Sequence, residues 1–169
     1  MDKKTKRLIP VAYCGLGVAL AFIMSYVELL IPPLYPAIPG IKMGLANIII
    51  IFLLYRSGPT GAATVSLLRI LLINLFFGNA MMLFYSLAGG LLSLLGMMLL
   101  KKIRIFSTVG VSIAGGVLHN VGQILMAMLL LETAQLGYYL AVLVVTGTLS
   151  GTLIGLCGAL LIKRIPQKK

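Results

Sequence analysis

Six apolar stretches follow one another along this chain, separated by short breaks of proline, glycine or charged residues. A helix needs about 20 apolar residues to cross ~30 Å of hydrocarbon. All the stretches except the second approach or exceed this length, so each is a candidate membrane span. The expected spans are about 8–31, 41–55, 60–77, 81–100, 107–131 and 138–162.

The composition excludes a water-soluble fold. Of the 169 residues, 60% are hydrophobic and 10% are charged, whereas soluble domains have about 25% charged residues. A core of this size cannot bury so much apolar surface, so the solvent must be lipid. A closed β-barrel would need strands in which polar and apolar residues alternate, and the sequence has no such alternation. The sequence therefore predicts an all-α integral membrane protein, with residues 1–169 forming a single bundle of six transmembrane helices.

The positions of the basic residues predict the orientation of this bundle. Twelve of the 14 Lys and Arg residues lie on one side of the predicted spans: Lys3, Lys4, Lys6, Arg7, Arg56, Lys101, Lys102, Arg104, Lys163, Arg164, Lys168 and Lys169. Positive charge accumulates in cytoplasmic loops, so both termini are expected in the cytoplasm and the loop Pro32–Gly40 outside. The expected location is the bacterial cytoplasmic membrane. The net charge of +11 is thereby assigned to anionic head groups rather than to nucleic acid.

Catalysis by this chain alone is not expected. Its acidic residues are Asp2, Glu28 and Glu132, so no acidic cluster is available to hold magnesium or to act as an acid/base pair. The sequence contains neither a phosphate-binding GxxxxGK[ST] loop nor a GxSxG nucleophile elbow. The single histidine and two separate cysteines match no metal-site pattern. We predict no catalytic residues, no resident metal and no cofactor.

Polar residues inside the predicted spans are the candidates for a binding site, because such groups are expensive in hydrocarbon. Arg69 lies near the middle of the third span, and an arginine keeps its charge there. His119 and Asn120 each lie within one helical turn of Gln123, which predicts a common polar face. An alternative is that these side chains only connect helices.

Two charged residues lie near the outer ends of the first two spans, Glu28 and Lys42, and form either a local ion pair or part of a ligand clamp. The prolines of the Pro32–Gly40 loop predict a stiff cover, from which Tyr35 packs over an aromatic or isoprenoid ligand. The predicted substrate-binding residues are Glu28, Tyr35, Lys42, Asn47, Arg69, Asn74, His119, Asn120 and Gln123.

Small residues recur at four-residue spacing in the last span, at Gly147, Gly151 and Gly155. Gly15 and Ala19 form a shorter version in the first span. Small residues let helix backbones approach closely in lipid. Both stripes therefore predict close helix contacts, either inside the bundle or with a partner subunit.

Four segments carry a resemblance to a known family: PGIKMGLANI (Pro39–Ile48), SLLRILLINLFFGN (Ser66–Asn79), FYSLAGGLLSLL (Phe84–Leu95) and GVSIAGGVLHNVGQ (Gly110–Gln123). They resemble the Gx transporter family, which is also labelled heptaprenyl diphosphate synthase component I. Its six-span layout is similar to that of S components of energy-coupling factor (ECF) transporters. The resemblance implies a subunit that captures a substrate from outside and works with a coupling subunit and ATPases. Gly15 with Ala19, and Gly17 with Ala21, stand where S components often have a docking Ala-x-x-x-Ala pattern.

Two functions remain open from the sequence. The first is a substrate-binding subunit for uptake of a small molecule, for which the resemblance suggests a flavin or an isoprenoid or quinone precursor. The second is a non-catalytic membrane anchor for a polyprenyl diphosphate synthase or for a flavin- or quinone-linked redox complex. Prenyl elongation requires Asp-rich motifs that hold Mg²⁺, and this chain has a single aspartate, Asp2. Any synthase activity must therefore come from a partner.

Overall fold

The structure, a computed structural model, describes residues 3–31 and 44–165, with side chains from residue 11 onward. Every regular element among these residues is helical, and none is a strand. The elements are α1 (Lys3–Leu30), α2 (Asn47–Arg56), α3 (Gly58–Phe77), α4 (Ala80–Ile103), α5 (Thr108–Leu130), the short 3₁₀ helix η1 (Ala134–Tyr139) and α6 (Leu140–Arg164). The predicted all-helical fold is confirmed.

Five of the described helices are long and apolar enough to cross a membrane, and α2 is the exception. With 10 residues, α2 rises only about 15 Å, half the thickness of the hydrocarbon. The predicted span 41–55 is therefore not matched by a full-length helix, and its first residues lie outside the described ranges. The chain is a multi-pass membrane protein by these helices, whereas a sixth crossing and the orientation stay predictions.

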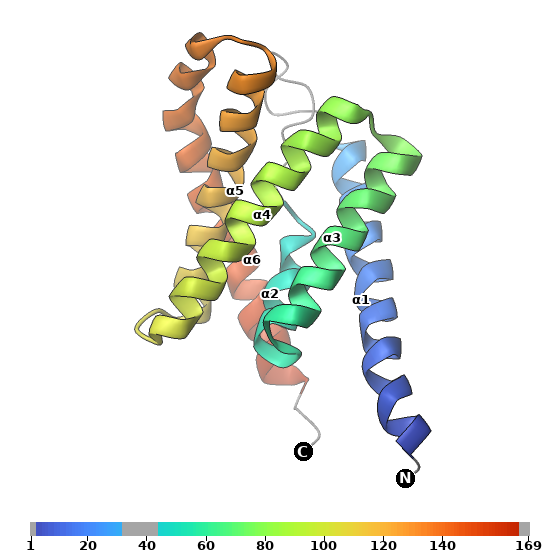
Figure 1. The fold of residues 1–169 in the computed structure, drawn as a ribbon. Helices are drawn as coiled ribbons and strands as arrows, with labels where there is room; N and C mark the ends of the chain where they lie inside the picture. Colours follow the sequence, from blue (N-terminus) through green and yellow to red (C-terminus); the bar gives the residue numbers. More distant parts are fainter. Residues whose placement is uncertain (1–2, 32–43, 166–169) are drawn as a thin grey trace.

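The long helices surround α2 (Figure 1). Helix α5 packs extensively against α4 and α6, and α1 lies at the edge of the bundle against α3. Helix α2 contacts α1, α3 and α6. The beginning of α1 and the end of α6 lie at the same end of the bundle, as an even number of crossings would require.

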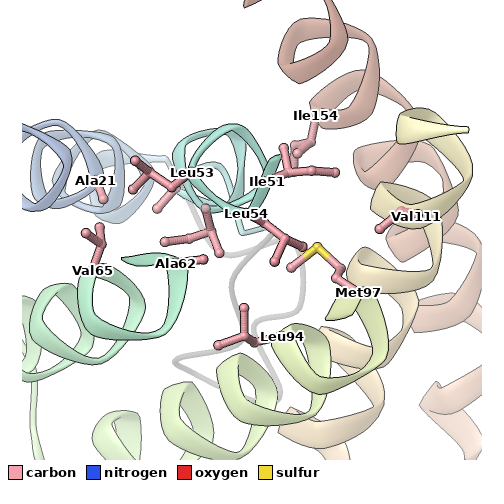
Figure 2. Packing of buried hydrophobic residues seen from close by; sticks show 12 residues of the cluster. Ala21, Ile51, Leu53, Leu54, Ala62, Val65, Leu94, Met97, Val111 and Ile154 are labelled. Carbon is pink, nitrogen blue, oxygen red and sulfur yellow. The ribbon is translucent and has the colours of Figure 1, made fainter. Parts of the chain in front are cut away.

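A core of aliphatic side chains holds α2 in place (Figure 2). Ile51 and Leu54 of α2 are 0% exposed and meet side chains from the neighbouring helices. Together with Leu53 on another side of α2, they belong to one buried cluster with Ala21, Ala62, Val65, Leu94, Met97, Val111 and Ile154. A helix too short to cross the bilayer is tolerated here because protein, not lipid, surrounds it.

The glycines of α6 lie against the backbone of α5. A methyl group on Gly151 would lie 2.7 Å from the Cα atom of Ile113, and one on Gly155 would lie 2.9 Å from the Cα atom of Val109. Gly147 similarly faces Gly116. This stripe is thus used inside the bundle, where side chains would hold the two backbones apart.

Gly15 and Ala19 are placed differently from the α6 glycines. Both are exposed on α1, and a methyl group on Gly15 would meet no atom within 4 Å. The buried face of α1 instead contains Gly17, Ala21 and Ser25. Gly15 and Ala19 therefore lie on the outer surface of the bundle.

Candidate functional site

Buried polar side chains from α1, α2 and α3 meet beside the first turn of α2. We call Ser25, Glu28, Asn47 and Arg69 the Arg69 cluster; each is at most 6% exposed. The Arg69 guanidinium donates to Ser25 Oγ (3.1 Å) and to Asn47 Oδ1 (3.2 Å). The Glu28 carboxylate interacts electrostatically with Arg69. The cluster thus contains a positive and a negative charge inside a membrane bundle.

The spacing of these residues along their helices explains why they meet. Ser25 and Glu28 are three residues apart on α1, which places both on its buried face. Arg69 lies on the buried face of α3, halfway along that helix, and Asn47 is the first residue of α2. The cluster is therefore in the middle of the bundle, where α2 begins.

Gly44 connects the Arg69 cluster to α5. Its backbone N–H donates to Glu28 Oε1 at 2.5 Å, and its φ of +83° is a left-handed value that favours glycine. A methyl group on Gly44 would lie 2.9 Å from Asn47 Nδ2 and 3.6 Å from His119 Cδ2. Gly44 therefore lies between Asn47 of the cluster and the His119 ring of α5.

The predicted polar face of α5 divides into two. His119 and Gln123 are 3% and 0% exposed and pack against Gly89 of α4, where a methyl group would lie 2.7 Å from Gln123 Cγ. Asn120 turns the other way and donates from Nδ2 to the Leu143 carbonyl of α6 at 2.8 Å and to Thr146 Oγ1 at 3.4 Å. Successive helical residues differ by about 100° in direction, which separates Asn120 from its neighbour.

The remaining predicted residues are not brought into the cluster by any described contact. Asn74 donates from Nδ2 to the Ile70 carbonyl of its own helix at 2.8 Å. Lys42 and Tyr35 lie outside the described residues, as does the proline-rich loop to which they belong. The predicted Glu28–Lys42 pair and the predicted cover therefore stay predictions.

Ser25 and Gly44 were not among the predicted site residues. The i, i+3 spacing of Ser25 to Glu28 is a signal that could have identified the serine. Four further buried serines, Ser66, Ser86, Ser93 and Ser112, are 5% exposed or less. Serine is common in membrane helices as a packing residue, so it is a weak indicator of a site.

Several buried polar atoms of the described residues have no hydrogen-bond partner among those residues. They are Arg69 Nε, Asn74 Oδ1, Ser86 Oγ and Ser93 Oγ. A buried polar atom without a hydrogen bond costs about 1–3 kcal/mol. Arg69 Nε is the charged member of this set, and a guanidinium N–H is a strong donor to carboxylate, phosphate or carbonyl oxygens. The Arg69 cluster therefore has one charged donor without a hydrogen bond among the described residues.

A sequence model of one family matches residues 18–161; its description is heptaprenyl diphosphate synthase component I. This range includes the Arg69 cluster, Gly44, His119 and the glycines of α6. Searches of the curated proteins and of the solved structures found no match. The family match covers all but the two ends of the chain. The chain therefore belongs to the heptaprenyl diphosphate synthase component I family.

Proposed function

We propose that this chain is a non-catalytic membrane subunit that binds a small molecule with anionic or carbonyl oxygens at the Arg69 cluster. In this proposal it acts as a substrate-binding subunit, similar to an ECF S component, in the uptake or translocation of that molecule. The observation that carries the proposal is the buried position of Arg69, 4% exposed, halfway along a membrane helix.

The free energy of burying charge supports a functional role for Arg69. A charged side chain in the middle of a membrane helix costs about 2.5–3.5 kcal/mol on insertion scales. A buried ion pair often contributes less stability than apolar residues of similar volume would. Apolar residues would therefore serve the packing of α1 against α3 as well as Glu28 and Arg69 do, so packing alone does not explain why these positions are charged. A ligand that needs the guanidinium supplies such a reason.

The half-length helix α2 supports a ligand at the same place. Its N-terminal end lies beside the Arg69 cluster, and Ala46 in the N-cap position provides no side-chain hydrogen bond. The N-terminal end of a helix has a partial positive charge of about half an elementary charge. Interrupted helices that begin near the middle of the bilayer form the substrate sites of many transporters. Arg69 and this helix end favour an oxygen-bearing group on the ligand, while the Glu28 carboxylate balances part of their positive charge.

His119 and Gln123 would give such a site direction. The His119 ring lies next to Gly44, which also lies beside Asn47 of the Arg69 cluster, and Gln123 lies with His119 against Gly89. An imidazole and an amide add donors and acceptors that orient a ligand, while apolar walls supply most of the contact area. A flavin or an isoprenoid or quinone precursor combines an apolar body with such oxygens, so these remain the proposed cargoes. A coupling subunit and ATPases would supply the energy.

A second function is supported by the family description. "Component I" of a synthase implies a further component, and the chemistry of prenyl elongation would belong to that partner. In this alternative the chain anchors a polyprenyl diphosphate synthase, or a flavin- or quinone-linked redox complex, at the membrane.

Native mass spectrometry of the protein extracted from its own membrane tests the two functions. A bound small molecule at one per chain, reduced at least tenfold in Arg69→Ala, would support the binding function. Because Arg69→Ala leaves Glu28 without its cationic partner, Ser25→Ala and Arg69→Lys are measured beside it, with Ser93→Ala as a buried serine control outside the cluster. A soluble synthase that co-purifies without any small molecule would instead support the anchor function.

A further inference from the structure

A groove opens between α3 and α4 at the end of the bundle where α1 begins and α6 ends. Its volume is about 440 Å³, and its walls are Pro59, Leu95, Met98, Leu99, Lys101, Lys102 and Arg104. Helices α3 and α4 diverge from the turn that joins them at the other end (Figure 1). Leu95 and Leu99 are 52% and 64% exposed, so the apolar part of the groove is continuous with the outer surface of the bundle.

The cations of the α3–α4 groove have different roles. Lys101 points inward, donating from Nζ to the Leu54 carbonyl of α2 at 2.5 Å and lying 4.8 Å from the centre of the Tyr55 ring. Lys102 and Arg104 are exposed and have neither a hydrogen-bond nor an ion-pair partner among the described residues. These two side chains are therefore available to an outside anion.

No described carboxylate lies near this groove to neutralise Lys102 and Arg104. Of the two described acidic residues, Glu28 is buried in the last turns of α1 and Glu132 follows the end of α5, and both of these helix ends lie away from the groove. The opposite wall adds further positive potential, because α3 begins at Gly58–Pro59 and the Ser57 side chain does not cap it. The groove thus combines a cationic mouth with an apolar floor.

We propose that the α3–α4 groove binds one anionic phospholipid of the bilayer. Its phosphate lies between the first turn of α3 and the side chains of Lys102 and Arg104, and an acyl chain lies along Leu95, Met98 and Leu99. Basic pockets between membrane helices on the cytoplasmic side bind anionic head groups in this way. A water-soluble phosphate would gain nothing from the leucines, so the apolar floor favours a lipid.

Native mass spectrometry of the delipidated full chain tests this site by titration with phosphatidylglycerol and with phosphatidylcholine of the same acyl chains. We expect one phosphatidylglycerol to bind at least tenfold more tightly than phosphatidylcholine. The double variant Lys102→Ala/Arg104→Ala should remove most of this preference, since each basic residue near the surface contributes about fivefold. The matched control is Lys163→Ala/Arg164→Ala, which removes the same charges from the same end of the bundle outside the groove.

A second pair of variants tests the apolar floor. Leu99→Trp fills the groove and should weaken phosphatidylglycerol binding several-fold, whereas Leu153→Trp on the exposed surface of α6 should leave it unchanged. An equal loss in the two charge variants would show only general attraction to the surface and would overturn the proposal. Unchanged phosphatidylglycerol binding by Leu99→Trp would overturn it as well. Geranylgeranyl diphosphate serves as a probe for an isoprenoid ligand, and a groove that binds it but not phosphatidylglycerol would also contradict the proposal.

Discussion

At the scale of single residues, neighbours on α5 divide between two tasks. His119 lies against Gly89 of α4 and next to Gly44 beside the Arg69 cluster, whereas the Asn120 amide donates to the Leu143 carbonyl of α6. The sequence shows both as polar residues within one span, and it cannot show which helix will stand opposite each of them. Their difference leads to a prediction that separates binding from packing.

Asn120→Ala should lower the free energy of unfolding by about 1 kcal/mol, since hydrogen bonds between membrane helices contribute about 0.6 kcal/mol and at most about 1.7. Ligand binding should stay within twofold of the wild type. Unfolding in mixed micelles gives the first quantity, and native mass spectrometry gives the second. A variant that keeps its stability and loses the ligand would place Asn120 in the binding site instead.

Arg69, Glu28, Asn47, His119 and Gln123 could be selected from the sequence because each is a polar residue in an apolar stretch. Which of these side chains meet could not be predicted, since that depends on where α1, α2, α3 and α5 lie relative to one another. Gly44 is the clearest example of a site residue that the sequence alone does not identify. Its left-handed backbone and its N–H bond to Glu28 are properties of the folded chain, and the sequence offers only one more glycine among 19.

At the scale of helices, the α5–α6 pair depends on residues without side chains. Gly151→Ala should reduce stability by about 1–3 kcal/mol, because the added methyl group would lie 2.7 Å from the Ile113 Cα atom and 2.8 Å from the Ser112 carbonyl oxygen. Thermal unfolding in detergent measures the effect.

The matched control for this prediction is Gly15→Ala, a glycine in an exposed part of α1 with nothing within 4 Å of the added carbon. Alanine is the better helix former by about 1 kcal/mol, so this variant should be neutral or slightly stabilising. If Gly151→Ala is as harmless as Gly15→Ala, α5 and α6 do not approach as closely as described.

Helix boundaries followed from the sequence to within a few residues for the five long helices. The apolar run Ile48–Tyr55 has the composition of a span, whereas α2, the helix that contains it, has about half the length of one. Hydrophobicity alone cannot distinguish a helix that crosses lipid from a shorter one that other helices bury. The buried aliphatic side chains around Ile51 and Leu54 show that the described part of this stretch is covered by other helices.

At the scale of the whole molecule, the basic residues at the end containing Lys101 and Arg164 predict that this end faces the cytoplasm. In a background without Cys14 and Cys157, a cysteine at Gln135 should react with a membrane-impermeant maleimide in intact cells. Ile105 is 82% exposed and lies at the end that contains Lys101, so a cysteine in its place should react only after permeabilisation. The reverse labelling pattern would contradict the predicted orientation.

The hydrogen bond from Arg69 to Ser25 also has a consequence for biosynthesis. A ribosome completes α1 before α3, so Ser25 and Glu28 have entered the membrane when the segment with Arg69 reaches the insertion machinery. An isolated segment would be penalised for its central arginine. Ser25 and Glu28, which are inserted earlier, offer Arg69 polar partners and so reduce that penalty. The order of the helices along the chain therefore favours insertion of α3 after α1.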